Sequence, residues 1–328
     1  MGRGSAPRRP DTRGGAVELT RHNERMSAAK ELQAAGITDP VLRASYLRCR
    51  ELNAAHGKTY FLATRLLPAA KRPYVHALYG LARYADEIVD TIDPAFTPQQ
   101  RADELGRWSQ AFMTDLGRGH STDPVAAAAV DTAQRWSIPA EHFAAFFHSM
   151  RMDLTVEQYQ SYEDLSEYVY SSAAVIGLQI MPILEPRSER TYDHARDLGI
   201  AFQLANFIRD VGEDLLRGRI YLPLDELAGH GVTPDTIRAH RVDDSWREAL
   251  AEQIGRVRML QARANPGIAM LHPTSQPCIA AASELYCGIV DEVEANDYDV
   301  FGHRARVPVR RRLAVAGPAA VRAVRARR

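Results

Sequence analysis

The stretch QLANFIRDVGEDLLRGRIYLP, residues 203–223, carries polar residues where a helix buried in a large protein should carry apolar ones. At about 100° per residue, an arc of roughly 80° holds Gln203, Asn206, Asp210, Asp214 and Arg217. A separate arc holds Leu204, Ile208, Val211 and Leu215. The pattern therefore predicts a helix with one apolar face and one stripe of amides, carboxylates and arginine.

The two carboxylates of this stripe, Asp210 and Asp214, lie one helical turn apart and repel each other. The repulsion costs a few tenths of a kcal/mol unless a cation lies between them. Arg217 or a bound Mg²⁺ ion would supply that cation. A solvated helix face is the other interpretation of an isolated Asp-x-x-x-Asp pair, and a second acidic stripe elsewhere in the chain argues against it.

That second stripe occurs in YGLARYADEIVD, residues 79–90. An arc of about 60° holds Tyr79, Arg83, Asp86 and Asp90. If the two helices face each other across a cleft, their four aspartates and Asn206 can hold Mg²⁺ ions, with Mn²⁺ as the alternative. Mg²⁺ prefers a couple of carboxylates plus substrate phosphate, and arginine suits phosphate oxygens.

The motifs DEIVD (residues 86–90) and DVGED (residues 210–214) resemble the two aspartate-rich signatures of the squalene and phytoene synthase family. The resemblance runs from about residue 56 to about residue 308. It includes HGKTYFLATRLLP from residue 56, RMDL from residue 151, ANPGIAML from residue 264 and ANDYDVFGHRARVP from residue 295. The implied fold is all-α: a single-domain isoprenoid-synthase helical bundle with a central cleft.

The resemblance also implies roles for individual residues. Catalytic roles are implied for Tyr79, Arg83, Asp86, Asp90, Asp210 and Asp214. Metal ligands are implied at Asp86, Asp90, Asn206, Asp210 and Asp214. Substrate contacts are implied at His56, Lys58, Thr59, Tyr60, Gln203, Asn206, Arg209, Arg217, Tyr286 and Arg304. Asp153 matches a family position as well, and we expect it to orient a helix rather than bind metal.

Two departures from the family pattern bear on these roles. Gly57 and Thr59 stand where relatives usually have serines, in the segment that matches the diphosphate-binding one. From local sequence alone, Lys58 and Thr59 are also consistent with a solvated helix cap. Glu87 replaces the middle acid of the usual Asp-Asp-x-x-Asp, and it projects about 80 to 100° away from Asp86.

The activity that the resemblance implies is head-to-head joining of two prenyl diphosphates through a cyclopropyl diphosphate. The motifs are most similar to those of bacterial phytoene synthases, which use two geranylgeranyl diphosphates and need no nicotinamide cofactor. The apolar stretch 165–184 is rich in small residues, which either let helices approach closely or leave a slot along the helix: Ser171, Ser172, Ala173, Ala174 and Gly177. The resemblance favours the slot, as the lining of a tunnel for the prenyl chain.

Three alternatives remain at this stage. A farnesyl diphosphate-using relative would make squalene, presqualene diphosphate or dehydrosqualene. A non-catalytic relative would be a prenyl-binding or assembly protein. A cyclising terpene synthase is disfavoured, because its second motif usually mixes Asn, Ser and Glu at other spacings.

Composition limits the partners and the location. The 328 residues hold 41 Lys and Arg against 41 Asp and Glu, so no bulk basic field suggests nucleic acid. Cys49, Cys278 and Cys287 have neither disulfide-framework nor zinc-ligand spacing, and we expect free thiols.

No apolar run approaches the roughly 18 residues that cross a bilayer. A cytoplasmic location is expected, with peripheral attachment to the inner face of the membrane as the alternative.

We divide the chain into a disordered N-terminal tail (residues 1–38), an isoprenoid synthase domain (39–312) and a loosely ordered basic C-terminal tail (313–328). After Asp299 the chain has nine arginines and no acid. Such a tail would be attracted to anionic lipid by about 1 kcal/mol per basic residue near the surface. A solvated tail without function is the other interpretation.

Overall fold

The computed structural model describes residues 26–90 and 96–328, and helices form the regular structure of this part of the chain. The elements are α2 (Pro40–His56), α3 (Lys58–Thr64), α4 (Arg72–Asp90), α5 (Pro98–Arg118), α6 (Ala126–Arg135), α7 (Ala140–Met152), α8 (Tyr162–Val169), the π-helical turn η1 (Tyr170–Ala174), α9 (Val175–Leu184), α10 (Arg190–Leu215), α11 (Leu224–Gly229), α12 (Pro234–Arg238), α13 (Asp244–Ala264), the 3₁₀ turn η2 (Asn265–Met270), α14 (Gln276–Cys287), α15 (Ile289–Ala295) and α16 (Val309–Arg325). The predicted all-α fold is confirmed.

Local sequence explains where several helices begin. Asp39 caps α2 by accepting a hydrogen bond from the Leu42 backbone N–H, and Pro40 occupies the first turn. Thr97 and Ser161 each form a capping box, at the starts of α5 and α8. The long helix α10 has no side-chain cap at its N-terminus, so packing against its neighbours stabilises it.

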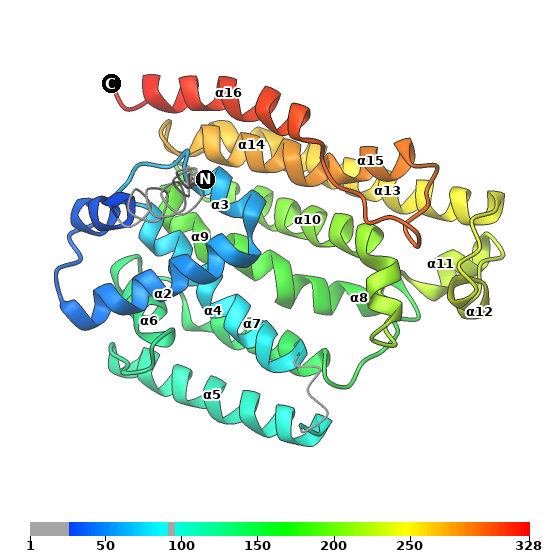
Figure 1. The fold of residues 1–328 in the computed structure, drawn as a ribbon, viewed down its shortest axis with the longest axis horizontal. Coiled ribbons are helices and arrows are strands. Elements are labelled where there is room, and N and C mark those ends of the chain that lie inside the picture. Colours follow the sequence, from blue (N-terminus) through cyan, green and yellow to red (C-terminus); the bar gives the residue numbers. More distant parts are fainter. Residues whose placement is uncertain (1–25, 91–95) are drawn as a thin grey trace, which may run out of the picture.

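The helices enclose two clusters of buried apolar side chains. One cluster draws mainly on α2 to α7, α9, α14 and α16, and the other mainly on α8, α10 to α13 and α15. Helices α14 and α15 contribute to both, through Ile289 in the first cluster and Cys287 in the second. Figure 1 shows α16 along one edge of the molecule, outside α14, and α5 along the opposite edge. Helices α4 and α10, which carry the two acidic stripes, lie between these edges.

Both ends of the described chain differ from the predicted tails. Residues 26–34 are helical, and Ala28, Leu32 and Ile37 are buried. The expected tail 1–38 is therefore wrong for residues 26–38, while residues 1–25 lie outside the described part. The C-terminal segment is also helical: Val315, Ala319 and Ala323 of α16 are buried. We missed both because short apolar faces gain their stability from tertiary packing.

The most apolar helical stretch runs from Tyr162 to Leu184, where α8, η1 and α9 form one continuous helix. Contrary to our expectation, its 23 residues are long and apolar enough to cross a membrane by length and composition. Over half of its most apolar window is buried inside the fold. A core helix passes the same test, and this one contributes to both apolar clusters.

The three cysteines are free and buried, as expected.

Candidate active site

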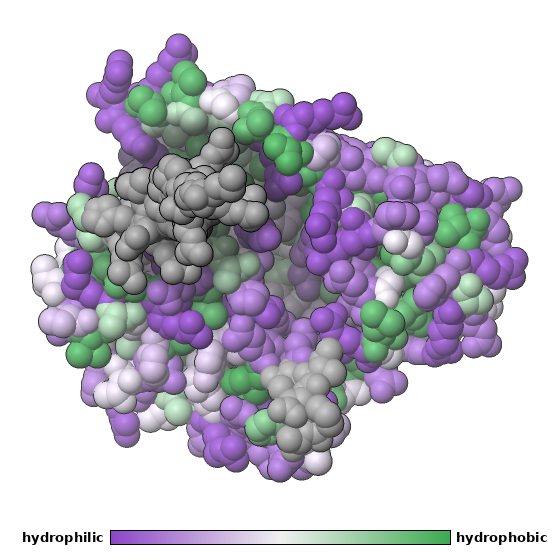
Figure 2. Space-filling view, in the orientation of Figure 1, coloured by the Kyte–Doolittle hydropathy of each residue, from purple (hydrophilic) through white to green (hydrophobic). Residues whose placement is uncertain are grey.

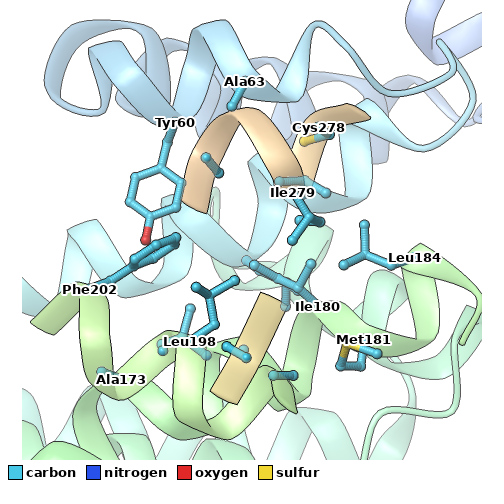
Figure 3. A pocket seen from close by; sticks show the side chains of 18 of the residues that line it. Tyr60, Ala63, Ala173, Ile180, Met181, Leu184, Leu198, Phe202, Cys278 and Ile279 are labelled. Carbon is cyan, nitrogen blue, oxygen red and sulfur yellow. The ribbon is translucent and has the colours of Figure 1, made fainter. Parts of the chain in front are cut away.

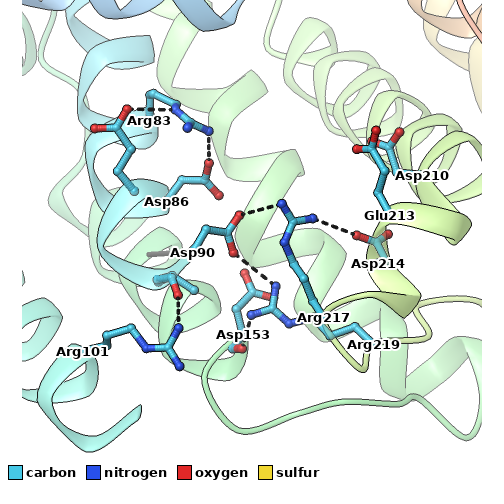
Figure 4. Close-up of polar contacts among 12 residues, drawn as sticks. Arg83, Asp86, Asp90, Arg101, Asp153, Asp210, Glu213, Asp214, Arg217 and Arg219 are labelled. Carbon is cyan, nitrogen blue, oxygen red and sulfur yellow. Dashed lines mark hydrogen bonds and ion pairs between the residues drawn. The ribbon is translucent and has the colours of Figure 1, made fainter. Parts of the chain in front are cut away.

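The two acidic stripes face each other across a gap that Arg217 bridges. Arg217 follows the end of α10, and its guanidinium lies 3.9 Å from an Asp90 oxygen and 3.8 Å from an Asp214 oxygen. Figure 4 shows Arg217 between Asp90 on α4 and Asp214 on α10. In Figure 2 the face of the molecule is hollowed near its centre, with hydrophilic side chains around the hollow. The predicted meeting of the two stripes is confirmed.

On the α4 side, Arg83 holds two acids. Its Nη1 donates to Asp86 at 2.5 Å and its Nε to Glu87 at 3.3 Å. Glu87 also lies 3.5 Å from His56 Nε2, away from the gap between the stripes. Desolvation, reinforced by the nearby Asp90 carboxylate, raises the pKa of Asp86 to about 6. The Asp86 site therefore favours a proton or a further cation.

On the α10 side, two arginines clamp Asp210. Arg209 Nε donates to Asp210 at 2.7 Å, and Arg304 donates through Nε and Nη2 at 2.8 and 3.0 Å. Burial alone would raise the pKa of Asp210, but the hydrogen bonds from both arginines outweigh it and hold the pKa below its usual value. Arg304 comes from the segment between α15 and α16, so distant parts of the chain meet at this acid.

In the same stripe, the side-chain oxygens of Asp214 and Asn206 have fewer hydrogen-bond and ion-pair partners than those of Asp210. Burial, followed by the Asp210 charge, raises the pKa of Asp214 to about 7. Asn206 Oδ1 is buried and finds no hydrogen-bond partner among the described residues. Such a donor set suits a hard cation, which takes oxygen ligands. Within residues 26–90 and 96–328, no three His, Cys, Asp or Glu side chains already converge as a metal site, since arginines separate the acids.

An apolar cavity of about 280 Å³ begins beside these polar residues. Tyr60, Tyr79, Phe202, Gln203 and Asn206 line it at the polar end. Figure 3 shows Leu184 and Met181 at the end away from Tyr60 and Phe202. Phe202 and Ile279 line the cavity and contact both apolar clusters, so the cavity lies where the two cores meet.

Three of the five small residues of the predicted tunnel helix line this cavity, while Ser171 and Ala174 are buried and do not line it. Ser172, Ala173 and Gly177 all border it. Ser172 lies in the π-helical turn η1, and its buried Oγ has no partner in the described chain. A second pocket shares Tyr79, Ala82, Ser172 and Gln203 with the cavity. Its other lining residues are both charged or polar and apolar: Arg83, Asp86, Phe146, Met150, Asp153 and Tyr168.

Comparison with known proteins identifies the family. A model of the squalene/phytoene synthase family matches residues 53–312. The chain is 39% identical over 277 residues to a phytoene synthase of Arthrospira platensis, covering 80% of this chain and 88% of the relative. It is 40% identical over 274 residues to the chloroplastic phytoene synthase 1 of Arabidopsis thaliana, covering 81% of this chain and 64% of that longer one.

The chain belongs to the squalene/phytoene synthase family. A crystal structure of a dehydrosqualene synthase in complex with ligand has the same fold, with a TM-score of 0.77 at 24% identity, over 85% of this chain and 96% of that one. As a member of this family, the protein is a prenyltransferase.

The segment that matches the family's diphosphate-binding motif lies on the α4 side of the site. His56 ends α2 and contacts Glu87, while Lys58 is exposed and Thr59 half-buried at the start of α3. The glycine at position 57 has a steric reason, because a Cβ there would lie 2.6 Å from Tyr79 Cζ. In this family member, the ring of Tyr79 fills the space that a serine side chain would need.

Tyr286 does not line the cavity directly. Its ring is buried against Tyr60 and Phe202, with ring centroids 4.6 and 4.8 Å apart. Both of those rings line the cavity. Tyr286 therefore supports the aromatic wall from behind, and its expected substrate contact stays a prediction.

Sequence reasoning missed Arg219, which lies in the quoted stretch but after the helix, where no periodicity applies. Its guanidinium lies 3.5 Å from Asp90 and donates to the Asp153 carbonyl oxygen at 2.7 Å. The Asp153 carboxylate accepts hydrogen bonds from the hydroxyls of Tyr168 and Tyr221, at 2.9 and 3.0 Å. Asp153 thus ties α7 to α8 and to the chain after α10, which fits its expected orienting role.

Proposed function

We propose that this protein is a phytoene synthase, which joins two molecules of geranylgeranyl diphosphate head to head, through a cyclopropyl diphosphate, and releases diphosphate. The observation that carries the proposal is the acid- and arginine-lined gap between α4 and α10, which opens onto a long apolar cavity. The similarity to two phytoene synthases over four fifths of the chain supports the choice of substrate.

Magnesium is the proposed cofactor, with manganese as the alternative ion and no nicotinamide cofactor. Asp86, Asp90, Asn206, Asp210 and Asp214 would hold it. The orphaned Asn206 oxygen and the raised pKa values of Asp86 and Asp214 support a cation at this place. When bound, the ion neutralises the charge that develops on the departing diphosphate.

The chain's own arginines would bind the diphosphate. Arg83, Arg209, Arg217 and Arg304 surround the gap, each engaged by an aspartate in the described structure. If the aspartates bound metal ions, the guanidinium N–H groups would become available to donate hydrogen bonds to diphosphate oxygens. Planar guanidinium groups suit such oxygens, and in a site shielded from water they stabilise the leaving group strongly.

The cavity would protect the allylic cation that diphosphate departure leaves behind. Its walls are mainly aliphatic, which excludes water from the reactive carbon. The rings of Tyr60 and Tyr79 lie 6.0 Å apart at the polar end and can stabilise a cation by cation–π attraction. The adjoining pocket, which Arg83, Asp86 and Asp153 also line, places the acidic stripe of α4 directly beside this cavity.

Product analysis tests the proposal. The purified protein is incubated with Mg²⁺ and either farnesyl or geranylgeranyl diphosphate, and the hydrocarbon is identified by mass spectrometry. We expect a C40 product from geranylgeranyl diphosphate. A C30 product alone would assign a squalene- or dehydrosqualene-type activity instead.

Replacing Asp210 by Ala tests catalysis against simple prenyl binding. The change removes the acid that Arg209 and Arg304 clamp, and we expect diphosphate release to fall by about 100- to 1,000-fold, as for other groups that stabilise developing charge. Diphosphate release at the wild-type rate would favour a non-catalytic prenyl-binding protein.

Peripheral attachment to an anionic membrane surface is the second part of the proposal, and α16 supports it. The apolar residues that α16 exposes, Val309, Leu313, Val321 and Val324, fall within an arc of about 120°. The helix carries five arginines and no acid. Figure 2 shows hydrophobic and hydrophilic side chains mixed along this edge. Arginines beside exposed apolar groups suit an anionic lipid surface.

Liposome flotation tests the attachment. We expect the protein to float with vesicles that contain 30% phosphatidylglycerol and to float less with pure phosphatidylcholine. Leu313→Glu should reduce flotation, while Val41→Glu, at an equally exposed valine of α2, should not. Equal flotation of both variants would reject α16 as the attached face.

A further inference from the structure

Lys71, directly before α4, is a buried cation outside the site described above. Its side chain is only 9% exposed. The ammonium donates to Ser275 Oγ at 3.0 Å and pairs with the Glu185 carboxylate. Lysine is seldom buried unless its charge is compensated. Glu185 follows α9 and Ser275 precedes α14, so one ammonium joins three separate segments.

These three residues, which we call the clasp, adjoin the end of the cavity that lies away from Tyr60. Leu184 precedes Glu185, Leu67 lies four residues before Lys71, and Leu271 lies four residues before Ser275. All three leucines line the cavity. Figure 3 shows Leu184 at the end remote from Tyr60. The clasp therefore holds together the chain segments that carry the cavity floor.

The backbone at and after Glu185 has an unusual conformation and is hydrogen-bonded to the segment before α14. Glu185 has φ of 57°, in the left-handed region, where glycine usually ends a helix. The next residues pair with the segment before α14: Arg187 N–H donates to Met270 O at 2.8 Å, and His272 N–H donates to Glu185 O at 3.0 Å. These two hydrogen bonds fix the backbone after α9 against the segment before α14, and the Glu185 carboxylate adds its pairing with Lys71.

We propose that the clasp of Lys71, Glu185 and Ser275 fixes the floor of the prenyl cavity and thereby limits the length of the chain that the protein binds. This inference rests on the proposed function, because it takes the cavity occupant to be a prenyl chain. A chain one isoprene unit too long must displace Leu184 or Leu271. With the clasp intact, that displacement also separates the buried Lys71 ammonium from the half-exposed Glu185 carboxylate, and a buried charge that loses its partner is strongly unfavourable.

Two variants break the clasp in different ways. Lys71→Met removes the ammonium and keeps an unbranched side chain. Glu185→Gly removes the carboxylate and relieves the left-handed backbone. The matched control is Arg256→Met, which breaks the half-buried Arg256–Glu226 ion pair between α13 and α11. Neither residue of that pair lines the cavity.

The experiment measures affinity for unreactive prenyl thiodiphosphates of 15, 20 and 25 carbons, by calorimetry with Mg²⁺. For the wild type we expect tight binding of its preferred length and weaker binding of the next longer one. A hydrophobic pocket discriminates by roughly 10-fold or more per added group. The length ratio is the affinity for the preferred chain length divided by the affinity for the next longer one. In both clasp variants we expect the length ratio to fall to about 3 or less, with the preferred length bound almost as tightly as before. Arg256→Met should keep the wild-type ratio.

An unchanged ratio in both clasp variants would overturn the inference, even if their melting temperatures fall, because the pair would then be purely structural. The inference would also be overturned if Arg256→Met lowered the length ratio as much as the clasp variants do. The result is independent of the product test. A wild type that prefers 15 carbons contradicts the proposed substrate but leaves the clasp to be judged by its own ratio.

Discussion

At the scale of single residues, the four aspartates differ in how their charges are balanced. Asp210 is held by two arginines, and Asp90 lies near Arg217 and Arg219. Asp86 forms an ion pair with Arg83, yet its pKa is raised to about 6. The pKa of Asp214 is raised further, to about 7. On binding of metal and diphosphate, the aspartates would therefore exchange arginine for metal, and the arginines would exchange aspartate for diphosphate.

Glu87 and Asp86 should contribute unequally to activity. Glu87 pairs with Arg83 and His56 away from Asp90, whereas Asp86 lies beside Asp90. We expect Asp86→Asn to lower kcat by at least about 100-fold, as for loss of a charge-stabilising group, and Glu87→Gln by about 10-fold or less. Steady-state diphosphate release measures both. Equal losses would make Glu87 a metal ligand.

Asp214 should destabilise the metal-free protein at high pH. Its raised pKa means that the folded chain holds this proton more tightly than the unfolded chain, so stability falls as pH rises from about 4 to about 7. Asp214→Asn carries no such charge. In EDTA at pH 8, we expect the variant to melt roughly 3–10 °C above the wild type, with the difference shrinking towards pH 4. A lower melting temperature at pH 8 would contradict the assignment.

At the scale of elements, close approach of helices shapes the cavity wall. A Cβ on Gly199 of α10 would lie 2.6 Å from the Ala173 carbonyl oxygen of η1. A Cβ on Gly177 of α9 would lie 2.8 Å from the Ala195 carbonyl oxygen of α10. Since Ala173, Gly177 and Gly199 all line the cavity, the two glycines set the distance between its walls.

Gly199→Ala should separate α10 from η1. Overpacking of this kind costs about 1–3 kcal/mol, and we expect the melting temperature to fall by about 3–10 °C. Gly255→Ala is the control, because it lies within α13 with no neighbouring atom within 4 Å of the added Cβ. An alanine there should be neutral or raise the melting temperature slightly. Similar effects of both changes would refute the packing argument. Differential scanning fluorimetry measures both.

Helical periodicity was sufficient to predict the two acidic stripes, because each lies within one helix. The lining of the tunnel by small residues came from the family resemblance instead. Periodicity could not predict Arg219, which reaches Asp90 from a loop, or the position of Tyr286 behind Tyr60. Residues 26–34 and α16 were misjudged as tails for a related reason. Their few buried side chains, such as Leu32 and Ala319, are stabilised by partners far away in the sequence.

At the scale of the whole molecule, the cavity lies between two apolar cores, with the acidic gap at one end and the clasp at the other. Contacts at both ends come from distant parts of the chain: Arg304 meets Asp210 at the gap, and Lys71 meets Glu185 and Ser275 at the floor. The amphipathic helix α16 covers one edge of this body. The arrangement places the charged gap at one end of the apolar cavity and an arginine-rich helix at an edge of the molecule.

A crystal structure with Mg²⁺ and an unreactive thio analogue of geranylgeranyl diphosphate tests the central claim most directly. We predict that the diphosphate lies between α4 and α10, with metal ions on Asp86, Asp90, Asp210 and Asp214 and the prenyl chain running towards Leu184. A diphosphate bound outside this gap, or a chain outside the cavity, would contradict the account.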